Sequence, residues 1–168
     1  MAPPAWLVQR WKEQPNWVKR FVQGSYELNA ILCGVPIDKS ATIWKPAAVR
    51  EFLAHMKKVQ QIATKPMILY RGTQVQSPTM SPAALTISSC QFMSTSKSQA
   101  IAKEFAGRNG YIQEFHVGKG VAYYDLEELY GDDPVKREKE VLLYPGCTLE
   151  LVSFNKNKLV WNITPKAA

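Results

Sequence analysis

The sequence has little of several residues that common classes of protein need. Its 168 residues include three cysteines, which lie far apart at Cys33, Cys90 and Cys147. An odd and sparse set of this kind argues against a disulfide framework and favours a reducing compartment. The two histidines, His55 and His116, are too few for a three-histidine zinc site and make a Ser-His-Asp triad a poor explanation. We therefore expect no bound metal.

Long hydrophobic runs are also missing. None approaches the ~20 apolar residues of a membrane span, and the first residues lack the apolar core of a secretory signal. We therefore expect no membrane association and place the protein in the cytoplasm of a target or host cell. The composition, 46% hydrophobic and 11% aromatic, is that of a globular protein, and the length suits one domain over residues 1–168, expected to be a monomer.

The net charge of +7 favours an anionic partner, which the charge alone does not identify. A dinucleotide, an acidic protein surface and nucleic acid all remain open. The basic residues are scattered along the chain, whereas a dedicated nucleic-acid arm would concentrate them in one segment.

Residues 1–65 have the pattern of helices. Apolar residues recur at near-helical spacing in 6–11 and 17–22, on either side of a break at Pro15. A clearer helix begins at Pro46, a residue that suits the first helical position. Its apolar face consists of Val49, Phe52, Leu53, Met56 and Val59.

Residues 66–168 have the pattern of strands with one short helix. The helix is expected over about 98–105, with a hydroxyl cap and Gly107 as its end. Strands are expected at 67–70, 90–93, 111–117, 121–124 and the segment around Glu140, followed by a hairpin of 148–154 and 159–163. Helices followed by strands predict an α+β domain, with a helical portion (1–65) and a β-rich catalytic core (66–168).

Three of the expected strands end in polar groups that together indicate chemistry. Arg71 follows the first strand, Ser94-Thr95-Ser96 follows the second, and Glu138 and Glu140 lead into Val141-Leu142-Leu143. Side chains two residues apart on a strand share a face, so the two glutamates should project together. Like charges at this separation repel, so the pair adds no stability. A solvated charged segment that leads into a strand explains the pair by itself, and a site that handles developing positive charge could also use both carboxylates.

These elements resemble the three motifs of the Arg-Ser-Glu class of mono-ADP-ribosyltransferases. The motifs are Tyr70-Arg71-Gly72, Phe92-Met93-Ser94-Thr95-Ser96 and Glu138-Lys139-Glu140-Val141-Leu142-Leu143, and they occur in the family's order over 69–146. The class includes actin- and Rho-modifying bacterial toxins, vertebrate ecto-enzymes and phage enzymes. The resemblance implies NAD as the donor and the ADP-ribosyltransferase fold: two packed, roughly perpendicular sheets around an NAD cleft, with N-terminal helices.

The resemblance also implies roles for the residues of the motifs. Arg71, flanked by Tyr70 and Gly72, would hold the NAD diphosphate, a task suited to a guanidinium. Ser94 would orient Glu140, the catalytic glutamate that stabilises the oxocarbenium-like sugar.

Other positions correspond to less constant parts of the family's site. Thr95 and Ser96 would support the cleft around the nicotinamide ribose. Glu138 would receive and help to deprotonate an acceptor arginine, as a glutamate does there in arginine-specific relatives. Tyr130, in the segment that presents the acceptor, is a candidate for acceptor recognition, although a tyrosine packed on its own loop explains it equally well. 

Two further candidates follow the short helix. Phe105 would stack on nicotinamide, unless it belongs to the helix core, and Arg108 would contact a phosphate. The expected partners are thus NAD and a target protein bearing an arginine, with a cognate immunity or inhibitor protein as a further candidate.

The sequence leaves several alternatives open. An NAD glycohydrolase would use the same residues with water as the acceptor, although water needs no Glu138. An RNA acceptor is a second alternative. A non-catalytic nucleic-acid-binding module would explain the charge but not the ordered motifs, and an inactive scaffold would not need every polar group to be present.

Overall fold

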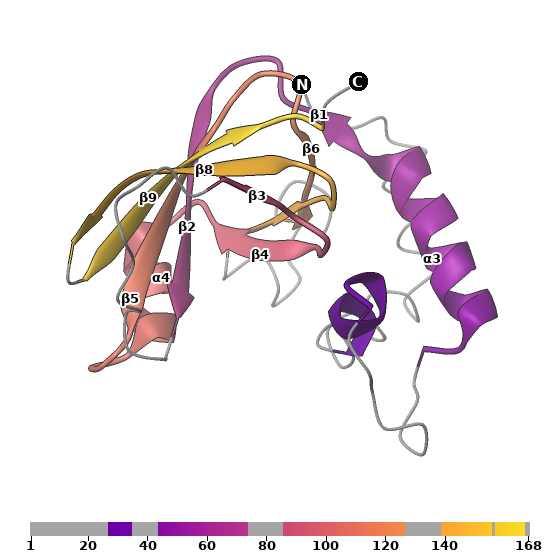
Figure 1. Ribbon diagram of the computed structural model, residues 1–168, viewed down its shortest axis with the longest axis horizontal. Coiled ribbons are helices and arrows are strands. Elements are labelled where there is room, and N and C mark those ends of the chain that lie inside the picture. Colours follow the sequence, from indigo (N-terminus) through magenta and orange to yellow (C-terminus); the bar gives the residue numbers. More distant parts are fainter. Residues whose placement is uncertain (1–26, 35–43, 74–85, 127–138, 156, 167–168) are drawn as a thin grey trace.

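The computed structural model describes residues 27–34, 44–73, 86–126, 139–155 and 157–166 (Figure 1). They form an α+β fold in which helical segments precede a sheet of nine strands, as the sequence predicts. The predicted helical segments at 6–11 and 17–22 lie outside the described residues. The division of the chain at residue 65 remains a prediction. None of the helices in the described ranges has the length and apolarity of a membrane-spanning helix.

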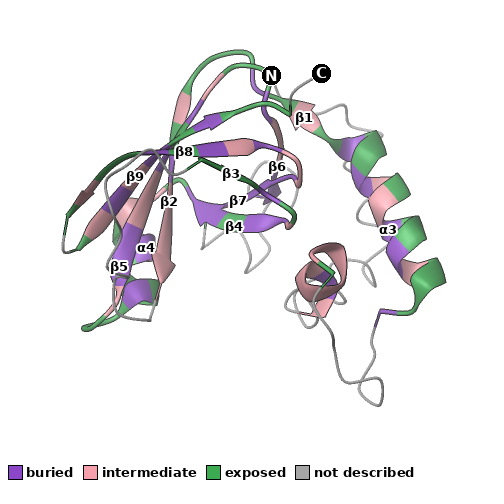
Figure 2. Ribbon diagram, in the orientation of Figure 1, coloured by how far each residue is buried: buried purple, intermediate pink, exposed green. Residues whose placement is uncertain are grey.

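Helix α3 (Pro46–Val59) forms where the periodic pattern predicts it. Pro46 occupies the first turn, where a missing N–H leaves no hydrogen bond unmade. Basic side chains in the last turn interact favourably with the negative end of the helix dipole. The buried residues are Val49, Phe52, Met56 and Val59. Figure 2 shows them as a stripe along one side of α3, opposite an exposed side. A helical segment at 27–32 packs with α3, since Leu28 belongs to the same cluster of buried residues as the apolar face of α3.

The nine strands follow one another in a single hydrogen-bonded order, β1-β6-β7-β4-β2-β5-β9-β8-β3. Their bounds are β1 Gln61–Ile62, β2 Met67–Thr73, β3 Thr86–Ser88, β4 Met93–Ser96, β5 Tyr111–Val117, β6 Ala122–Asp125, β7 Glu140–Leu143, β8 Thr148–Asn155 and β9 Lys158–Thr164. The β5–β9 pair is parallel and the other pairs are antiparallel. Strands β2 and β4 share one register pair, Tyr70 with Ser96. This narrow junction divides the sheet into two arms, β1-β6-β7-β4 and β2-β5-β9-β8-β3.

Two cores lie on opposite faces of the first arm. The first core joins α3 to the strands through an edge-to-face chain of aromatic rings, Trp44, Phe52, Phe92 and Tyr144, with centroids 5.1 to 5.6 Å apart. The second core takes residues from both arms, among them Leu69, Phe115, Val141, Leu149 and Trp161. The predicted pair of packed sheets is thus present as two arms that enclose a shared core.

The structure corrects the expectation about cysteine. Cys33 and Cys90 form a disulfide across a sequence separation of 57 residues, while Cys147 is free and buried. The same two segments are joined by Asn29, whose side-chain amide exchanges two hydrogen bonds with the main chain of Phe92 at 3.0 and 3.1 Å. Sequence spacing missed the pair because only tertiary packing brings the segments together. The cysteine content therefore no longer supports a reducing compartment.

Most predicted elements agree with the structure, and one is displaced. Strand β5 and the helix α4 (Gln99–Ala106) occupy the predicted positions, and β8 and β9 form the predicted hairpin. The strand predicted at 90–93 instead begins at Met93 and continues to Ser96, so the Ser-Thr-Ser segment is strand rather than the turn after it. Strands β1 and β3, of two and three residues, are too short to produce a periodic pattern.

Candidate active site

Three of the predicted residues form a row across three strands. Tyr70 on β2 pairs with Ser96 on β4, and Ser96 pairs with Glu140 on β7. Residues paired directly across a sheet project from the same face. Glu140 is half-buried at the first position of β7, and Ser96 is buried. The register therefore puts Ser96, rather than Ser94, directly opposite the predicted catalytic glutamate.

Ser94 lies on the same face, one step further along the strand. It pairs with Leu142, whose side chain belongs to the first core, and it is exposed. Since Glu140 is two residues from Leu142 on β7, Ser94 and Glu140 occupy diagonal positions on this face. Diagonal neighbours remain within reach of long side chains, so the arrangement is compatible with the predicted contact.

The side chains around this row fasten the strands to each other. Thr95 projects from the opposite face, where its buried hydroxyl donates to the carbonyl of Val141 at 2.6 Å. The hydroxyl of Ser96 accepts from the N–H of Ser98 at 3.0 Å, and the hydroxyl of Ser98 caps α4 by accepting from the N–H of Ile101. The Ser-Thr-Ser segment thereby connects β7 to the start of α4.

Arg71 projects from the face opposite to Tyr70, because the two residues are neighbours on an extended strand. Its guanidinium is half-buried and reaches the carbonyl of Ser94 at 3.5 Å, a long contact that leaves other N–H groups available to a ligand. Burial lowers the pKa of Arg71 from its ordinary value, and the interaction with Tyr111 opposes that shift. A guanidinium nevertheless stays protonated at physiological pH.

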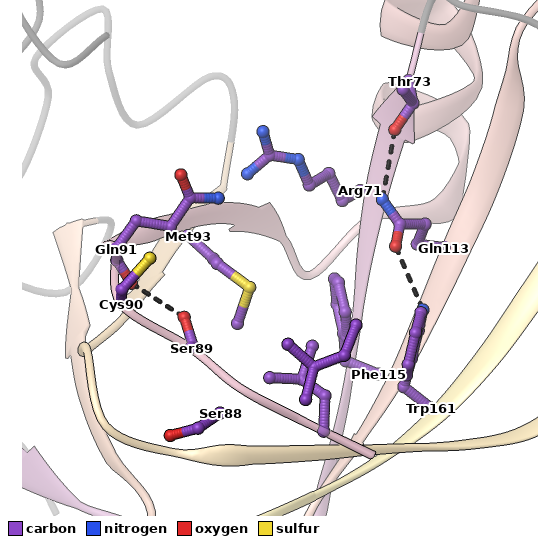
Figure 3. Close-up of a pocket in the computed structure, with 12 residues that line it drawn as sticks. Arg71, Thr73, Ser88, Ser89, Cys90, Gln91, Met93, Gln113, Phe115 and Trp161 are labelled. Atoms are coloured by element: carbon purple, nitrogen blue, oxygen red, sulfur yellow. Dashed lines mark hydrogen bonds between the residues drawn. The ribbon is translucent and has the colours of Figure 1, made fainter. Parts of the chain in front are cut away.

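A pocket of about 300 Å³ opens beside Arg71, lined mainly by strands of the second arm together with Met93 of β4 and the segment before it. Its polar lining consists of Arg71, Thr73, Ser88, Ser89, Gln91 and Gln113, and its apolar lining includes Met93, Phe115, Leu149 and Trp161. Figure 3 shows the guanidinium of Arg71 extending from β2 toward Gln91. One half-buried cation among neutral hydrogen-bonding groups and aromatic rings suits part of a phosphate-bearing ligand with a planar ring.

One wall of this pocket is held in place by Gln113, a polar side chain that no sequence motif indicated. Gln113 pairs with Arg71 across β2 and β5. Its amide nitrogen donates to the hydroxyl of Thr73 at 3.2 Å, and its amide oxygen accepts from the indole of Trp161 at 3.0 Å (Figure 3). Both bonds join residues distant in sequence, so no local motif could reveal them.

Gly72 has a packing role that the motif does not reveal. A Cβ at this position would lie 1.9 Å from the carbonyl oxygen of Ala102 on α4. Gly110 is similarly crowded, 2.0 Å from the carbonyl oxygen of Ala106. Glycine at both positions lets α4 lie directly against β2 and β5. A contact of Gly72 with NAD remains a prediction.

The remaining predicted residues are less closely grouped. Phe105 is 49% exposed on α4, whose buried residues are Ala102 and Ala106, so the alternative that Phe105 belongs to the helix core is wrong. Arg108 is exposed just after α4. Tyr130 and Glu138 lie outside the described residues.

The backbone before Glu140 changes the argument for the glutamate pair. Lys139 has a φ of 49°, in the left-handed region, and β7 begins only at Glu140. Strand alternation therefore does not extend through Lys139, and it gives no reason for Glu138 and Glu140 to share a face. The part of the chain that the structure describes also contains no cluster of three or more potential metal ligands.

Comparisons with known proteins identify the fold. No family model and no curated protein sequence matches the chain. Solved structures match with probability 1.00 at low sequence identity. The ADP-ribosylating toxin BECa of C. perfringens, solved with NADH, aligns with a TM-score of 0.62 and 15% identity over 94% of this chain. The chain spans about half of that protein, since the match covers 48% of BECa.

Two other solved structures align with this chain over most of their own length. The Vis toxin of Vibrio splendidus, an ADP-ribosyltransferase, aligns with a TM-score of 0.60 and 16% identity over 96% of this chain and 74% of Vis. Exoenzyme S of Pseudomonas aeruginosa, solved with human 14-3-3 protein beta and carba-NAD, aligns with a TM-score of 0.58 and 16% identity over 88% of this chain and 70% of its own. The chain therefore has the ADP-ribosyltransferase fold.

Proposed function

We propose that the chain is an NAD-dependent mono-ADP-ribosyltransferase that modifies an arginine of a target protein inside a cell, as a toxin, effector or phage enzyme. One observation carries this proposal. In an ADP-ribosyltransferase fold, Arg71 faces a pocket while Ser96 and Glu140 pair across neighbouring strands. Arg71 and Glu140 are the residues that the sequence predicts for their motifs, and Ser96 belongs to the same Ser-Thr-Ser segment as Ser94, the serine predicted to orient Glu140.

The described residues fit NAD by their chemistry. The diphosphate of NAD is a dianion, and the half-buried guanidinium of Arg71 supplies a permanent charge with several donors. The pocket beside it offers neutral polar groups and the aromatic rings of Phe115 and Trp161. Its volume of about 300 Å³ is sufficient for part of a dinucleotide, so the remainder would lie along the surface toward Glu140.

Glu140 would act on the sugar. When the bond between nicotinamide and C1′ breaks, nicotinamide leaves with the bonding electrons and C1′ acquires cationic character. A carboxylate fixed at the start of β7 would stabilise that charge. The acceptor nitrogen then bonds to C1′ and loses a proton, a task for which the sequence proposes Glu138.

The test follows both products of the reaction. Purified protein is given labelled NAD with a cell lysate or with agmatine, a small guanidine acceptor, and both nicotinamide release and labelled acceptor are measured. Glu140→Gln should lower both by about 100-fold to 1000-fold, the usual loss when a stabilising group is removed. Glu150→Gln changes a second strand glutamate, which is exposed on β8, and should behave as the unchanged protein.

The outcomes distinguish the proposed transferase from an NAD glycohydrolase. Release of nicotinamide without any labelled acceptor would show an NAD glycohydrolase and contradict the transferase assignment. If Glu140→Gln keeps as much activity as the control Glu150→Gln, the assignment of Glu140 as the catalytic glutamate is wrong.

A further inference from the structure

Lys97 follows β4 and contacts both the turn before β7 and strand β6. It directly follows Ser96 at the end of β4. Its main-chain N–H donates to the carbonyl of Lys139 at 3.1 Å, and its amine lies 2.5 Å from a carboxylate oxygen of Asp125 on β6. Since β7 lies between β4 and β6, Lys97 reaches from one neighbour of β7 to the other across its first residues.

The contacts of Lys97 are aligned with Glu140. Ser96 pairs with Glu140, and Asp125 pairs with Val141, the next residue of β7. The main-chain N–H of Asp125 also donates to the side-chain oxygen of Gln61 at 2.9 Å, which ties the end of β6 to β1. The start of β7 is thereby held from both sides.

The turn before Glu140 needs such support. Lys139 has a φ of 49°, a conformation that a residue with a side chain adopts only where its surroundings hold it. The carbonyl of Lys139 accepts from Lys97, so the same residue that contacts Asp125 also orients the peptide that leads into Glu140. A shift in this peptide would move the Glu140 carboxylate directly.

The two side chains of the ion pair differ in exposure. The Asp125 side chain is 4% exposed, so its charge depends on a partner inside the protein, while the Lys97 side chain is 37% exposed. Removal of the Lys97 amine takes away a partner of a buried carboxylate. A methionine at position 97 would keep the aliphatic part of the side chain in place. The pair can therefore be broken from the exposed side without creating a cavity.

We propose that Lys97 is a positioning residue for Glu140, acting through the ion pair with Asp125 and the hydrogen bond to Lys139. The proposal rests on the proposed function, because its main effect is on the step that Glu140 serves. Lys97 does not line the pocket beside Arg71, so binding of NAD should depend on it little.

The first experiment measures the steady-state kinetics of nicotinamide release by Lys97→Met, Lys97→Arg and the control Lys103→Met. Lys103 is exposed on α4 and belongs to no part of the site. Lys97→Met should lower kcat by about tenfold to 100-fold, the scale expected when a reacting group is misplaced, with KM for NAD unchanged. Lys97→Arg keeps the charge and should restore most of kcat, while Lys103→Met should match the unchanged protein.

The second experiment asks whether the effect passes through Asp125. If Lys97 acts through this carboxylate, Lys97→Met combined with Asp125→Asn should lose no more kcat than the more damaged single variant, because the two residues form one unit. Multiplying losses would overturn the proposal, and so would an unchanged kcat in Lys97→Met. An equal loss in Lys97→Arg would overturn it as well.

A third measurement does not depend on activity. Hydrogen exchange of the Glu140, Val141 and Leu142 amides should be faster in Lys97→Met than in the unchanged protein and in Lys103→Met. If the unchanged protein releases no nicotinamide, the proposed function fails, and the exchange result still decides the inference. Unchanged exchange at these three amides would overturn the positioning role.

Discussion

The two cores of the chain are held together by different means. The second core lies between strands that are joined mainly by main-chain pairing, including seven register pairs between β2 and β5. The first core instead attaches helices to one face of β6 and β7, and side chains make most of the connections. These are the Cys33–Cys90 disulfide, the Asn29 bonds to Phe92 and the Tyr144 hydroxyl, which donates to the carbonyl of Met56 at 2.6 Å.

The difference also divides the candidate site. Ser94 and Glu140 project from the face that bears the first core, whereas Arg71 shares its face with Leu69 of the second core. The group that would act on the sugar and the group that would hold the phosphates are thus supported by separate sets of contacts. Changes to one core should affect one function more than the other.

The largest expected effect comes from two neighbouring leucines of β7. Leu142 is 2% exposed in the first core and Leu143 is 0% exposed in the second. Each change to alanine should lower the free energy of unfolding by about 2–5 kcal/mol, through lost burial and a cavity. Hydrogen exchange should then rise in α3 for Leu142→Ala and in β8 and β9 for Leu143→Ala.

That matched pair tests whether the cores are separate. An identical pattern of faster exchange in both variants would show that the two cores open together. Chemical denaturation gives the free energies, and the neighbouring positions of the two leucines keep local sequence effects equal.

The disulfide should contribute the next largest effect. Replacing Cys33 and Cys90 by serine, or reducing the bond, should cost about 2–4 kcal/mol by releasing the loop that the bond closes in the unfolded chain. Exchange should become faster at 27–32 and in α3 while β5 and β9 keep their protection. Denaturation curves that do not change with reductant would contradict this expectation.

Within the described residues, burial raises the pKa of an ionisable group in each core. Burial raises the pKa of Cys147 in the second core to about 11, and it raises the pKa of Tyr144 in the first core above its ordinary value. For both groups the folded state keeps its proton to higher pH than the unfolded state. Stability is therefore fully present below the unfolded pKa values and is lost as the pH rises toward the folded ones.

For Cys147 this loss should amount to about 2 kcal/mol as the pH rises from about 9 to about 11. Denaturation at several pH values would measure it. Cys147→Ala should flatten the decline in this window, and Tyr144→Phe should flatten it only at higher pH. A decline that neither variant alters would assign the alkaline sensitivity to other groups.

The smallest expected effect, which tests the candidate site most directly, concerns Arg71. Arg71→Lys keeps the charge but loses the planar set of donors, so under the proposed function KM for NAD should rise by about tenfold, or about 1.4 kcal/mol, with a smaller change in kcat. Arg50→Lys, on the exposed side of α3, is the matched control. A loss confined to kcat would show that Arg71 serves the same step as Glu140. It would contradict the assignment of NAD binding and catalysis to opposite faces of the sheet.

Strong local patterns allowed much of the fold to be predicted. Pro46 with its spaced apolar residues specified α3, and Ser98 with Gly107 marked the ends of α4. The Ser94 segment was misplaced because polar residues resemble a turn, although in β4 the hydroxyl of Thr95 is satisfied by the carbonyl of Val141. Residues without a local motif, such as Gln113 and Asp125, had no signal in the sequence.

The sequence by itself determined the order of the motifs, the α+β class and the identities of Arg71, Ser94 and Glu140 as candidates, because these depend on residue type and short-range spacing. Tertiary structure alone decided the register that sets Ser96 opposite Glu140, the disulfide from Cys33 and the contacts of Lys97. Each of these joins segments far apart in the chain. Such contacts depend on how strands align and which faces pack, and neighbouring residues do not encode that alignment.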